Sequence, residues 1–349
     1  MDLQCLGSAL ANCTNLQKLI LDLNQNKISD SGASGLGSAL AKTNISNLRL
    51  YLCFNQIGGQ GASGLGSALA NCTNLSNLAL LLFKNQIDGQ GASNLGSALA
   101  NCINLSNLTL DLSNNKIDAI GASGLGSALK STNISNLTLI LCNNQIGDQG
   151  ASGLGSALAN FTNLSNLKLD LYNNQIGDQG VSGLGQALTN CTNLSNLELD
   201  LSQNQITQIG ASGLGFALAN CTNLSNLILN FGKIGDQSVS GLGSALANCT
   251  NLSNLTLNLT YNQIGDQSVQ DLGSALAHCT NLQNLMLNLD FNKIGAIGGQ
   301  GLGSALVNCT NLSNLTLFLH GNLINQSQKL KVKSKYLKSK RLVDLSICY

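Results

Sequence analysis

The sequence predicts an α/β solenoid in which a parallel sheet lines the concave face of a horseshoe or arc and helices cover the convex face. A short strand-like motif recurs every 28 to 30 residues through all 349 residues. Each copy also has a strand-like half and a helix-like half. Units of this length bury their apolar faces only against their neighbours, which is typical of repeat proteins. The first apolar residue of the motif stands at Leu16, Ile45, Leu75, Leu105, Ile134, Leu164, Leu194, Leu224, Leu252, Leu282, Leu312 and Leu342.

The third copy, residues 75–102, illustrates both halves. Leu78, Leu80 and Leu82 alternate with variable residues, which is the period of a strand with one buried face. Ala92 and Leu95 begin a stripe with spacings of three and four, typical of a short amphipathic helix. A strand followed by a helix in every copy predicts parallel strands joined by helical crossovers.

These motifs resemble a known family. The pattern L-x-x-L-x-L followed by N-x-I is similar to a leucine-rich repeat, and the repeat length with its G-x-x-x-L-x-x-x-L half resembles the ribonuclease-inhibitor-like subclass. The resemblance covers essentially the whole chain and implies a binding surface on the concave sheet. One spacing departs from the family: two more residues separate the strand leucines from the following Asn, as in residues 169–174, which predicts longer strands.

Two recurrent Asn positions are interpreted as structural. In the family, the Asn that follows the strand forms a ladder to neighbouring backbone, since a buried amide needs such partners. A second Asn closes the helices, where we expect a left-handed backbone. The eighth copy, residues 227–234, is two residues short and lacks the ladder Asn, so we expect a local kink or bulge there. The ladder positions are Asn26, Asn55, Asn85, Asn115, Asn144, Asn174, Asn204, Asn262, Asn292 and Asn322, and the helix-closing positions include Asn71, Asn101, Asn190 and Asn220.

The domain organisation is predicted to be simple. Residues 1–349 are interpreted as a single domain of about twelve strands, because the 38 Gly and absent Pro leave no rigid linker. Residues 325–349 are expected to form a basic C-terminal capping repeat, since Val332 and Tyr336 stand thirty residues after Leu302 and Leu306. At the other end the sequence begins inside a helix, which indicates either a helical cap or a fragment, and an edge open to self-association.

The cysteines are predicted to be free thiols in a reducing compartment and not disulfides. Eight of the twelve share one repeat position, which Phe161 fills in the sixth copy, so the position is interpreted as a buried apolar site. Stacked free thiols indicate a reducing compartment, and we expect a cytoplasmic protein, with the nucleus as the other option. No secretory signal and no 18-residue apolar stretch is visible. The eight positions are Cys13, Cys72, Cys102, Cys191, Cys221, Cys249, Cys279 and Cys309.

Several function classes find no support in the sequence. His278 and His320 have no patterned nucleophile, and no C-x-x-C or His pair has zinc-ligand spacing, so we predict no catalytic residues, no metal and no cofactor. The basic residues between Lys329 and Arg341 are interpreted as a solvated cap, with an anion-binding patch as the alternative. Without these seven residues and Asp344, ten basic residues remain against fifteen acidic ones, which argues against nucleic-acid binding by the repeats.

The residues that vary between copies are the candidate binding residues, because alternate strand positions face the hollow of the arc. Two patches stand out, one with aromatic, aliphatic and basic side chains that tend to anchor interfaces, and one with acidic residues expected to lie side by side at about 4.8 Å strand spacing. The predicted partner-binding residues are Arg49, Tyr51, Phe54, Leu81, Phe83, Lys84, Asp111, Lys168, Asp170, Tyr172, Glu198 and Asp200.

We therefore expect a non-enzymatic scaffold that holds a protein or peptide partner on the concave face. One alternative is a GTPase-activating regulator similar to Ran GTPase-activating protein, although that family has an acidic tail and a catalytic Arg on a loop, whereas the two Arg here are Arg49 and Arg341. The other alternative is a sensor module cut from a larger kinase or receptor.

Overall fold

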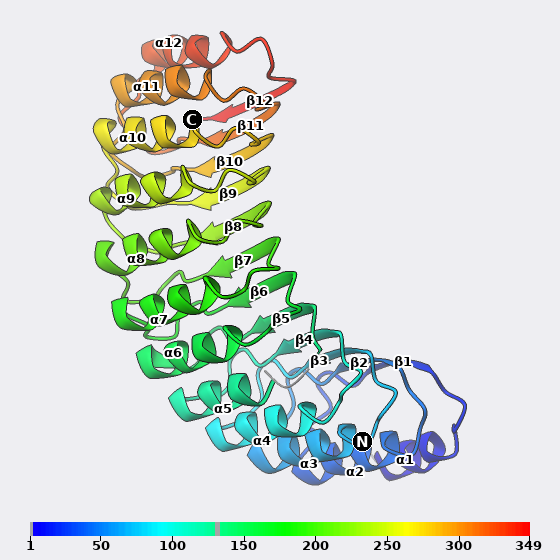
Figure 1. Cartoon of the computed structure of the whole chain (residues 1–349). Helices are drawn as coiled ribbons and strands as arrows, with labels where there is room; N and C mark the ends of the chain where they lie inside the picture. The colour runs from blue at the N-terminus through cyan, green and yellow to red at the C-terminus, as the bar shows by residue number, and fades with distance from the viewer. Residues whose placement is uncertain (1–2, 130–132) are drawn as a thin grey trace. The chain divides into compact units, whose positions relative to one another are not determined.

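The computed structural model describes residues 3–129 and 133–349. The chain divides into two compact units, Met1–Ile176 and Gly177–Tyr349, and each is described by itself. Figure 1 shows that helices and strands alternate along both units.

In the described part of the first unit, six helices alternate with six strands. The helices are α1 (Leu3–Ala11), α2 (Asp30–Leu40), α3 (Gly59–Leu69), α4 (Gly89–Leu99), α5 (Ala119–Leu129) and α6 (Gly147–Leu158). The strands are β1 (Lys18–Asp22), β2 (Asn47–Tyr51), β3 (Asn77–Leu81), β4 (Asn107–Asp111), β5 (Asn136–Ile140) and β6 (Asn166–Asp170).

The second unit has the same alternation of six helices and six strands, all within the described residues. The helices are α7 (Asp178–Leu188), α8 (Gln208–Leu218), α9 (Asp236–Leu246), α10 (Asp266–Leu276), α11 (Ala296–Leu306) and α12 (Gln326–Tyr336). The strands are β7 (Asn196–Asp200), β8 (Asn226–Asn230), β9 (Asn254–Asn258), β10 (Asn284–Asn288), β11 (Asn314–Phe318) and β12 (Asp344–Cys348).

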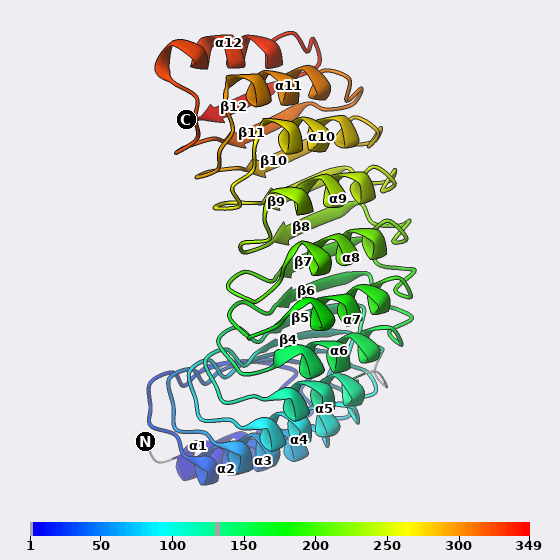
Figure 2. The same cartoon turned by 90° about the vertical axis from the view of Figure 1, so that its left-hand side faces the viewer.

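The strands of each unit form a parallel sheet in chain order, with equivalent residues directly paired. Leu48 pairs with Leu78 and Leu78 with Leu108 in the first unit, and Leu285 pairs with Leu315 in the second. Figure 2 shows the helices of each unit lying side by side in one layer. This arrangement confirms the predicted α/β solenoid class, because each crossover helix returns the chain to the next parallel position.

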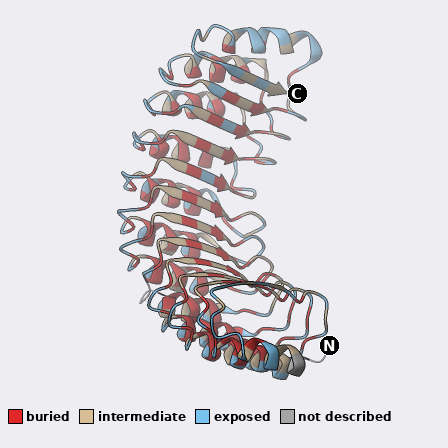
Figure 3. Ribbon diagram, turned by 90° about the vertical axis from the view of Figure 1, so that its right-hand side faces the viewer, coloured by how far each residue is buried: buried red, intermediate tan, exposed pale blue. Residues whose placement is uncertain are grey.

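The core lies between the sheet and the helices of each unit. Leu78, Leu80 and Leu82 are buried, whereas the residues between them are not, and Ala92 and Leu95 of α4 are fully buried. Figure 3 shows this alternation of buried and more exposed residues along the strands. The two hydrophobic periods therefore identified the buried faces correctly.

The regular strands are five residues long, but the ladder of inter-repeat hydrogen bonds continues beyond them. The backbone N–H of Leu52 donates to the carbonyl of Leu81 at 2.8 Å, and that of Phe54 donates to Phe83 at 2.9 Å. The additional residues before the ladder Asn thus extend backbone pairing past the end of each strand.

The predicted asparagine ladder is present in both units. In the first, Asn55 Oδ1 accepts the backbone N–H groups of Asn26 (3.0 Å) and Ile28 (2.9 Å), while its Nδ2 donates to the carbonyls of Leu23 and Leu52, both at 2.9 Å. The side chain thereby joins two repeats and satisfies backbone groups in a buried turn.

The prediction for the helix-closing Asn was wrong in its geometry. Asn71, Asn101, Asn190 and Asn220 are not among the described residues with positive φ. The Nδ2 of Asn71 instead donates to the carbonyl of Ser67 at 3.1 Å, one helical turn earlier. His278 Nδ1 lies 3.0 Å from the Ser274 carbonyl in the same arrangement. A side-chain hydrogen bond satisfies the helix end, so no left-handed residue is needed.

The eighth copy is two residues short, and the turn after its strand, not the strand itself, accommodates the difference. β8 stays in register with β7 and β9, since Leu227 pairs with both Leu197 and Leu255. Gly235 has a φ of +85°, a conformation that glycine adopts without strain. The amide of Asn262 in the next repeat donates to the Gly232 carbonyl at 3.1 Å. The expected irregularity is therefore a rebuilt turn within an intact sheet.

The basic segment at the end of the sequence forms a twelfth repeat. Val332 and Tyr336 of α12 are buried, as their thirty-residue offset predicts, and β12 pairs in register with β11. The Tyr336 hydroxyl donates to the Gly299 carbonyl at 2.9 Å. Its burial is complete enough to raise the pKa of this phenol well above its usual value.

Candidate functional site

The candidate site is the face of each sheet opposite the helices. Leu48 and Leu50 of β2 point into the core and are fully buried, so Arg49 and Tyr51 point the other way. Because the strands are parallel and in register, equivalent residues of successive repeats form rows across this face.

In the first unit, one row carries a change of character along its length. Tyr51 pairs with Leu81, Leu81 with Asp111, and the row continues through Ile140 to Asp170. All five side chains are half-buried. The row thus begins with an aromatic and an aliphatic side chain, and its third and fifth positions, Asp111 and Asp170, are carboxylates.

The neighbouring row of the first unit has a cation near each end. Exposed Arg49 pairs with Ala79 of β3, while half-buried Lys168 pairs with Thr138 of β5. The small side chains of Ala79, Thr109 and Thr138 separate the two cations in this row.

Three predicted residues of the first unit form a compact cluster at the end of the strands. The rings of Phe54 and Phe83 meet edge to face with centroids 5.0 Å apart, and Lys84 Nζ lies 5.2 Å from the Phe54 centroid. Phe54 and Lys84 have φ of 56° and 53°, in the left-handed region. The turn before each ladder Asn requires this conformation, which costs a bulky residue energy. Aromatic rings and cations are among the side chains that commonly anchor protein interfaces.

The predicted carboxylates also have structural partners. Asp111 accepts the backbone N–H of Ser113 at 2.9 Å, and Asp170 accepts that of Tyr172 at 3.0 Å. In the second unit, Asp200 accepts the N–H of Ser202 at 2.9 Å. These bonds shape the turns after β4, β6 and β7, so the three carboxylates have a role in the fold.

The predicted acidic stripe spans the division of the chain. Asp170 belongs to the first unit, whereas Glu198 and Asp200 belong to the second. Within the second unit, Glu198 pairs with Ile228 and Asp200 with Asn230, whose amide donates to the Asp200 carboxylate at 3.1 Å. The stripe that joins Asp170 to Asp200 stays a prediction.

The second unit carries an aromatic pair that the sequence analysis missed. The rings of Tyr261 and Phe291 are stacked 4.6 Å apart at an angle of 3°, and the residues are 54% and 49% exposed. They occupy the same repeat position as Phe54, directly before the ladder Asn, so repeat alignment could have identified them. In the next repeat Gly321 takes this position, and a Cβ there would lie 2.5 Å from the Phe291 ring.

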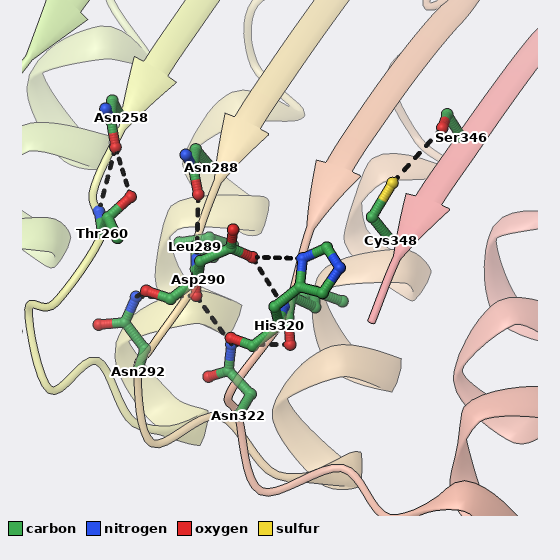
Figure 4. Close-up of polar contacts among 11 residues, drawn as sticks. Asn258, Thr260, Asn288, Leu289, Asp290, Asn292, His320, Asn322, Ser346 and Cys348 are labelled. Carbon is green, nitrogen blue, oxygen red and sulfur yellow. Dashed lines mark hydrogen bonds and ion pairs between the residues drawn. The ribbon is translucent and has the colours of Figure 1, made fainter.

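A polar pair lies beside these rings. The carboxylate of Asp290 accepts the backbone N–H of His320 at 2.7 Å and lies 3.2 Å from its Nδ1 (Figure 4). The same close-up shows Asn292 and Asn322, the ladder residues that hold the two turns in place. Met286, 40% exposed on β10, adds an apolar side chain to the face of this unit.

The recurrent cysteines form a structural column. Cys279 Sγ donates to the Leu246 carbonyl of the preceding repeat at 3.2 Å, and burial raises the pKa of this thiol to about 12. Phe161 is buried at the equivalent position, as expected. Cys13 is an exception, because it is exposed and the expectation of burial was wrong there.

Among the described residues, no group of three or more His, Cys, Asp or Glu side chains could hold a metal ion. No helix in the described ranges has the length and apolar character to cross a bilayer.

Comparison with known families supports the repeat assignment. A family model described as "Leucine Rich repeat" matches residues 12–37, 104–126, 163–185, 193–215 and 251–273. Comparison with curated proteins gave no match.

Proposed function

This chain is a leucine-rich-repeat protein, and we propose that it is a non-enzymatic scaffold that binds a protein or peptide on the exposed face of its sheets. Repeats of this family generally mediate protein–protein interaction. The proposal extends that general role to the face described above.

One observation carries this proposal: buried positions are uniform, while exposed ones vary. Leu occupies the buried position of β2, β3 and β4 at residues 48, 78 and 108. The neighbours on the opposite face are Arg49, which is exposed, and Ala79 and Thr109, which are half-buried. Packing explains the uniform Leu, whereas the variable face is available for recognition by a partner.

The cluster of Phe54, Phe83 and Lys84 is the proposed anchor, and Arg49, Tyr51 and Leu81 are proposed contacts on the strands β2 and β3 that lead to it. Aromatic and Arg side chains dominate the binding energy of most interfaces, and truncation of such a residue weakens binding by about 2 kcal/mol or more. Asp111, Lys168, Asp170, Tyr172, Glu198 and Asp200 are proposed as additional contacts that set orientation and association rate rather than affinity.

Quantitative affinity capture from the cell of origin tests the proposal. We expect the double variant Phe54→Ala/Phe83→Ala to lose specific partners that the wild type retains. Phe216→Ala is the matched control, because Phe216 is 62% exposed on α8, on the helical side. Equal loss in the control, or full retention by the double variant, would reject the sheet face as the binding surface.

We also propose a cytoplasmic location, with the nucleus as the other option. Seven cysteines of the column are buried as free thiols, which a reducing compartment preserves. Fluorescence imaging of the tagged full-length chain tests this, and accumulation in the secretory pathway would contradict it.

A further inference from the structure

The side of α12 that faces away from α11 differs from the corresponding side of the other helices in the unit. In α10, Gly273 lies where a Cβ would be 2.9 Å from Leu302 and 3.1 Å from Ala305 of the next helix. Gly303 has the same role toward Tyr336 and Lys335. Thirty residues later this position is Lys333, which is exposed. A further repeat of the same kind cannot pack closely there, because the lysine occupies the required space.

This surface combines apolar side chains with positive charge. Leu330 and Leu337 are 78% and 64% exposed and are seven residues apart, so they lie on one side of the helix with Lys333 between them. Lys331 is exposed on α12 directly after Leu330, and exposed Lys338 directly follows the C-cap residue Leu337 in the turn that ends the helix. We call Leu330, Lys331, Lys333, Leu337 and Lys338 the terminal patch.

The charge of the terminal patch has no local counterpart in the sequence. Residues 326–343 include seven basic residues and no acidic one. Two of the seven basic residues contact other parts of the fold. Arg341 donates to the Thr310 carbonyl at 2.7 Å, and Lys329 Nζ lies 5.3 Å from the Tyr349 ring centroid. The lysines of the patch are exposed and present a concentrated positive field.

We propose that the terminal patch docks this protein onto an anionic lipid bilayer. Clusters of basic residues on a helix bind the negative surface of a membrane, and exposed Leu side chains insert at the boundary between headgroups and acyl chains. Within the second unit, Figure 2 shows α11 on one side of α12 and no described element on the opposite side. Docking through α12 leaves the sheet face of the unit accessible to a protein partner.

Two other occupants fit the observations less well. A second copy of the same patch would bring like charges together, which opposes self-association. An acidic protein would need recesses to receive Leu330 and Leu337, which protrude, whereas a fluid lipid interface adapts to protruding side chains. The charges of the patch are all Lys, which suits a diffuse anionic surface, while Arg is preferred for bidentate recognition.

Cosedimentation of the full chain with vesicles tests the proposal. We expect binding to vesicles of phosphatidylcholine with phosphatidylserine, no binding to phosphatidylcholine alone, and weakening of the bound state by salt. Each lysine near an anionic surface contributes about fivefold, so the variant Lys331→Gln/Lys333→Gln/Lys338→Gln should bind on the order of 100-fold more weakly.

Two further variants make the experiment decisive. Lys18→Gln/Lys42→Gln/Lys116→Gln changes net charge equally at exposed positions of the first unit and should bind like wild type. Leu330→Ser/Leu337→Ser retains all charges and should bind more weakly, without loss of fold because both side chains are exposed.

The proposal is overturned if the wild type does not prefer anionic vesicles, or if either variant of the terminal patch binds as tightly as wild type. Capture of soluble polyglutamate by a chain that ignores anionic vesicles would also overturn it, in favour of an acidic protein partner. These outcomes are independent of whether the sheet face binds a protein.

Discussion

Substitution of Asn292 by Ala should destabilise the second unit strongly. The side chain is 5% exposed and its Oδ1 accepts the backbone N–H groups of Asn262 at 2.9 Å and Ile264 at 3.0 Å. Its Nδ2 donates to the carbonyls of Leu259 at 3.0 Å and Leu289 at 2.8 Å. One amide therefore bonds to five backbone groups, with the Asp290 carbonyl as the fifth at 3.2 Å.

The expected magnitude follows from which groups lose a partner. The Leu289 carbonyl keeps the Nδ2 of Asn322 at 2.8 Å. The N–H groups of Asn262 and Ile264 and the carbonyl of Leu259 lose the bonds described above, and a buried polar group without a partner costs about 1–3 kcal/mol. We expect Asn292→Ala to lower the free energy of unfolding by about 3–6 kcal/mol, since some water will reach the turn.

Urea denaturation followed by circular dichroism measures this loss, and native-state hydrogen exchange at the Asn262 and Ile264 amides localises it. Asn311→Ala is the matched control, because its exposed side chain donates only to the Thr280 carbonyl in the described structure, at 2.6 Å. That change should cost about 1 kcal/mol. Equal losses in the two variants, or unchanged exchange at Ile264, would refute the ladder as the source of stability.

Three further expectations concern glycine contacts and thiols. Gly91→Ala in α4 should destabilise the first unit by about 1–3 kcal/mol in urea denaturation, because the new Cβ would lie 2.4 Å from the Gly59 Cα. Gly35→Ala in α2 should stabilise the unit by about 0.5–1 kcal/mol, because a Cβ there would meet no atom within 4 Å and Ala favours a helix more than Gly does. The reverse order of stability would contradict the helix packing. Iodoacetamide should modify exposed Cys13 well before Cys279, because burial raises the pKa of the Cys279 thiol to about 12 and removes the reactive thiolate; equal labelling of the native protein, read by peptide mass spectrometry, would argue against the column. The same raised pKa makes stability depend on pH: below the ordinary value of 9.0 the thiols contribute no pH dependence, and as the pH rises from 9.0 toward 12 the unfolded chain loses protons that the folded chain keeps, so the melting temperature should fall. A melting temperature that rises over this interval would contradict the assignment.

Some of the candidate site was visible in the sequence, and some was not. Alternation with buried Leu placed Arg49 and Tyr51 on the exposed face, because strand geometry sends successive side chains to opposite sides. The contact of Phe54 with Phe83, and the stacking of Tyr261 on Phe291, join residues about thirty positions apart. Such contacts depend on the left-handed turn and on side-chain rotamers, which periodicity does not encode.

The helix-ending Asn residues show the same limit. Their type and position indicated a helix end, but Asn can satisfy that end by a left-handed backbone or by its side chain. Asn71 uses its side chain, donating to Ser67, and Ala70 before it has a right-handed helical backbone. Local sequence allowed both conformations, and only the structure shows which one the chain adopts.

The sequence by itself determined the repeat length, the strand and helix in each copy, the buried leucines, the ladder Asn and the twelfth repeat. Each of these follows from periodicity, which reports the faces of a strand or helix directly. The tertiary structure decided which exposed residues meet: the rings of the two aromatic clusters, the Asp290 and His320 pair, and the exposure of Leu330 and Leu337 beside lysines. These depend on how neighbouring repeats stack in three dimensions, because strands about 4.8 Å apart bring together residues that are distant along the chain.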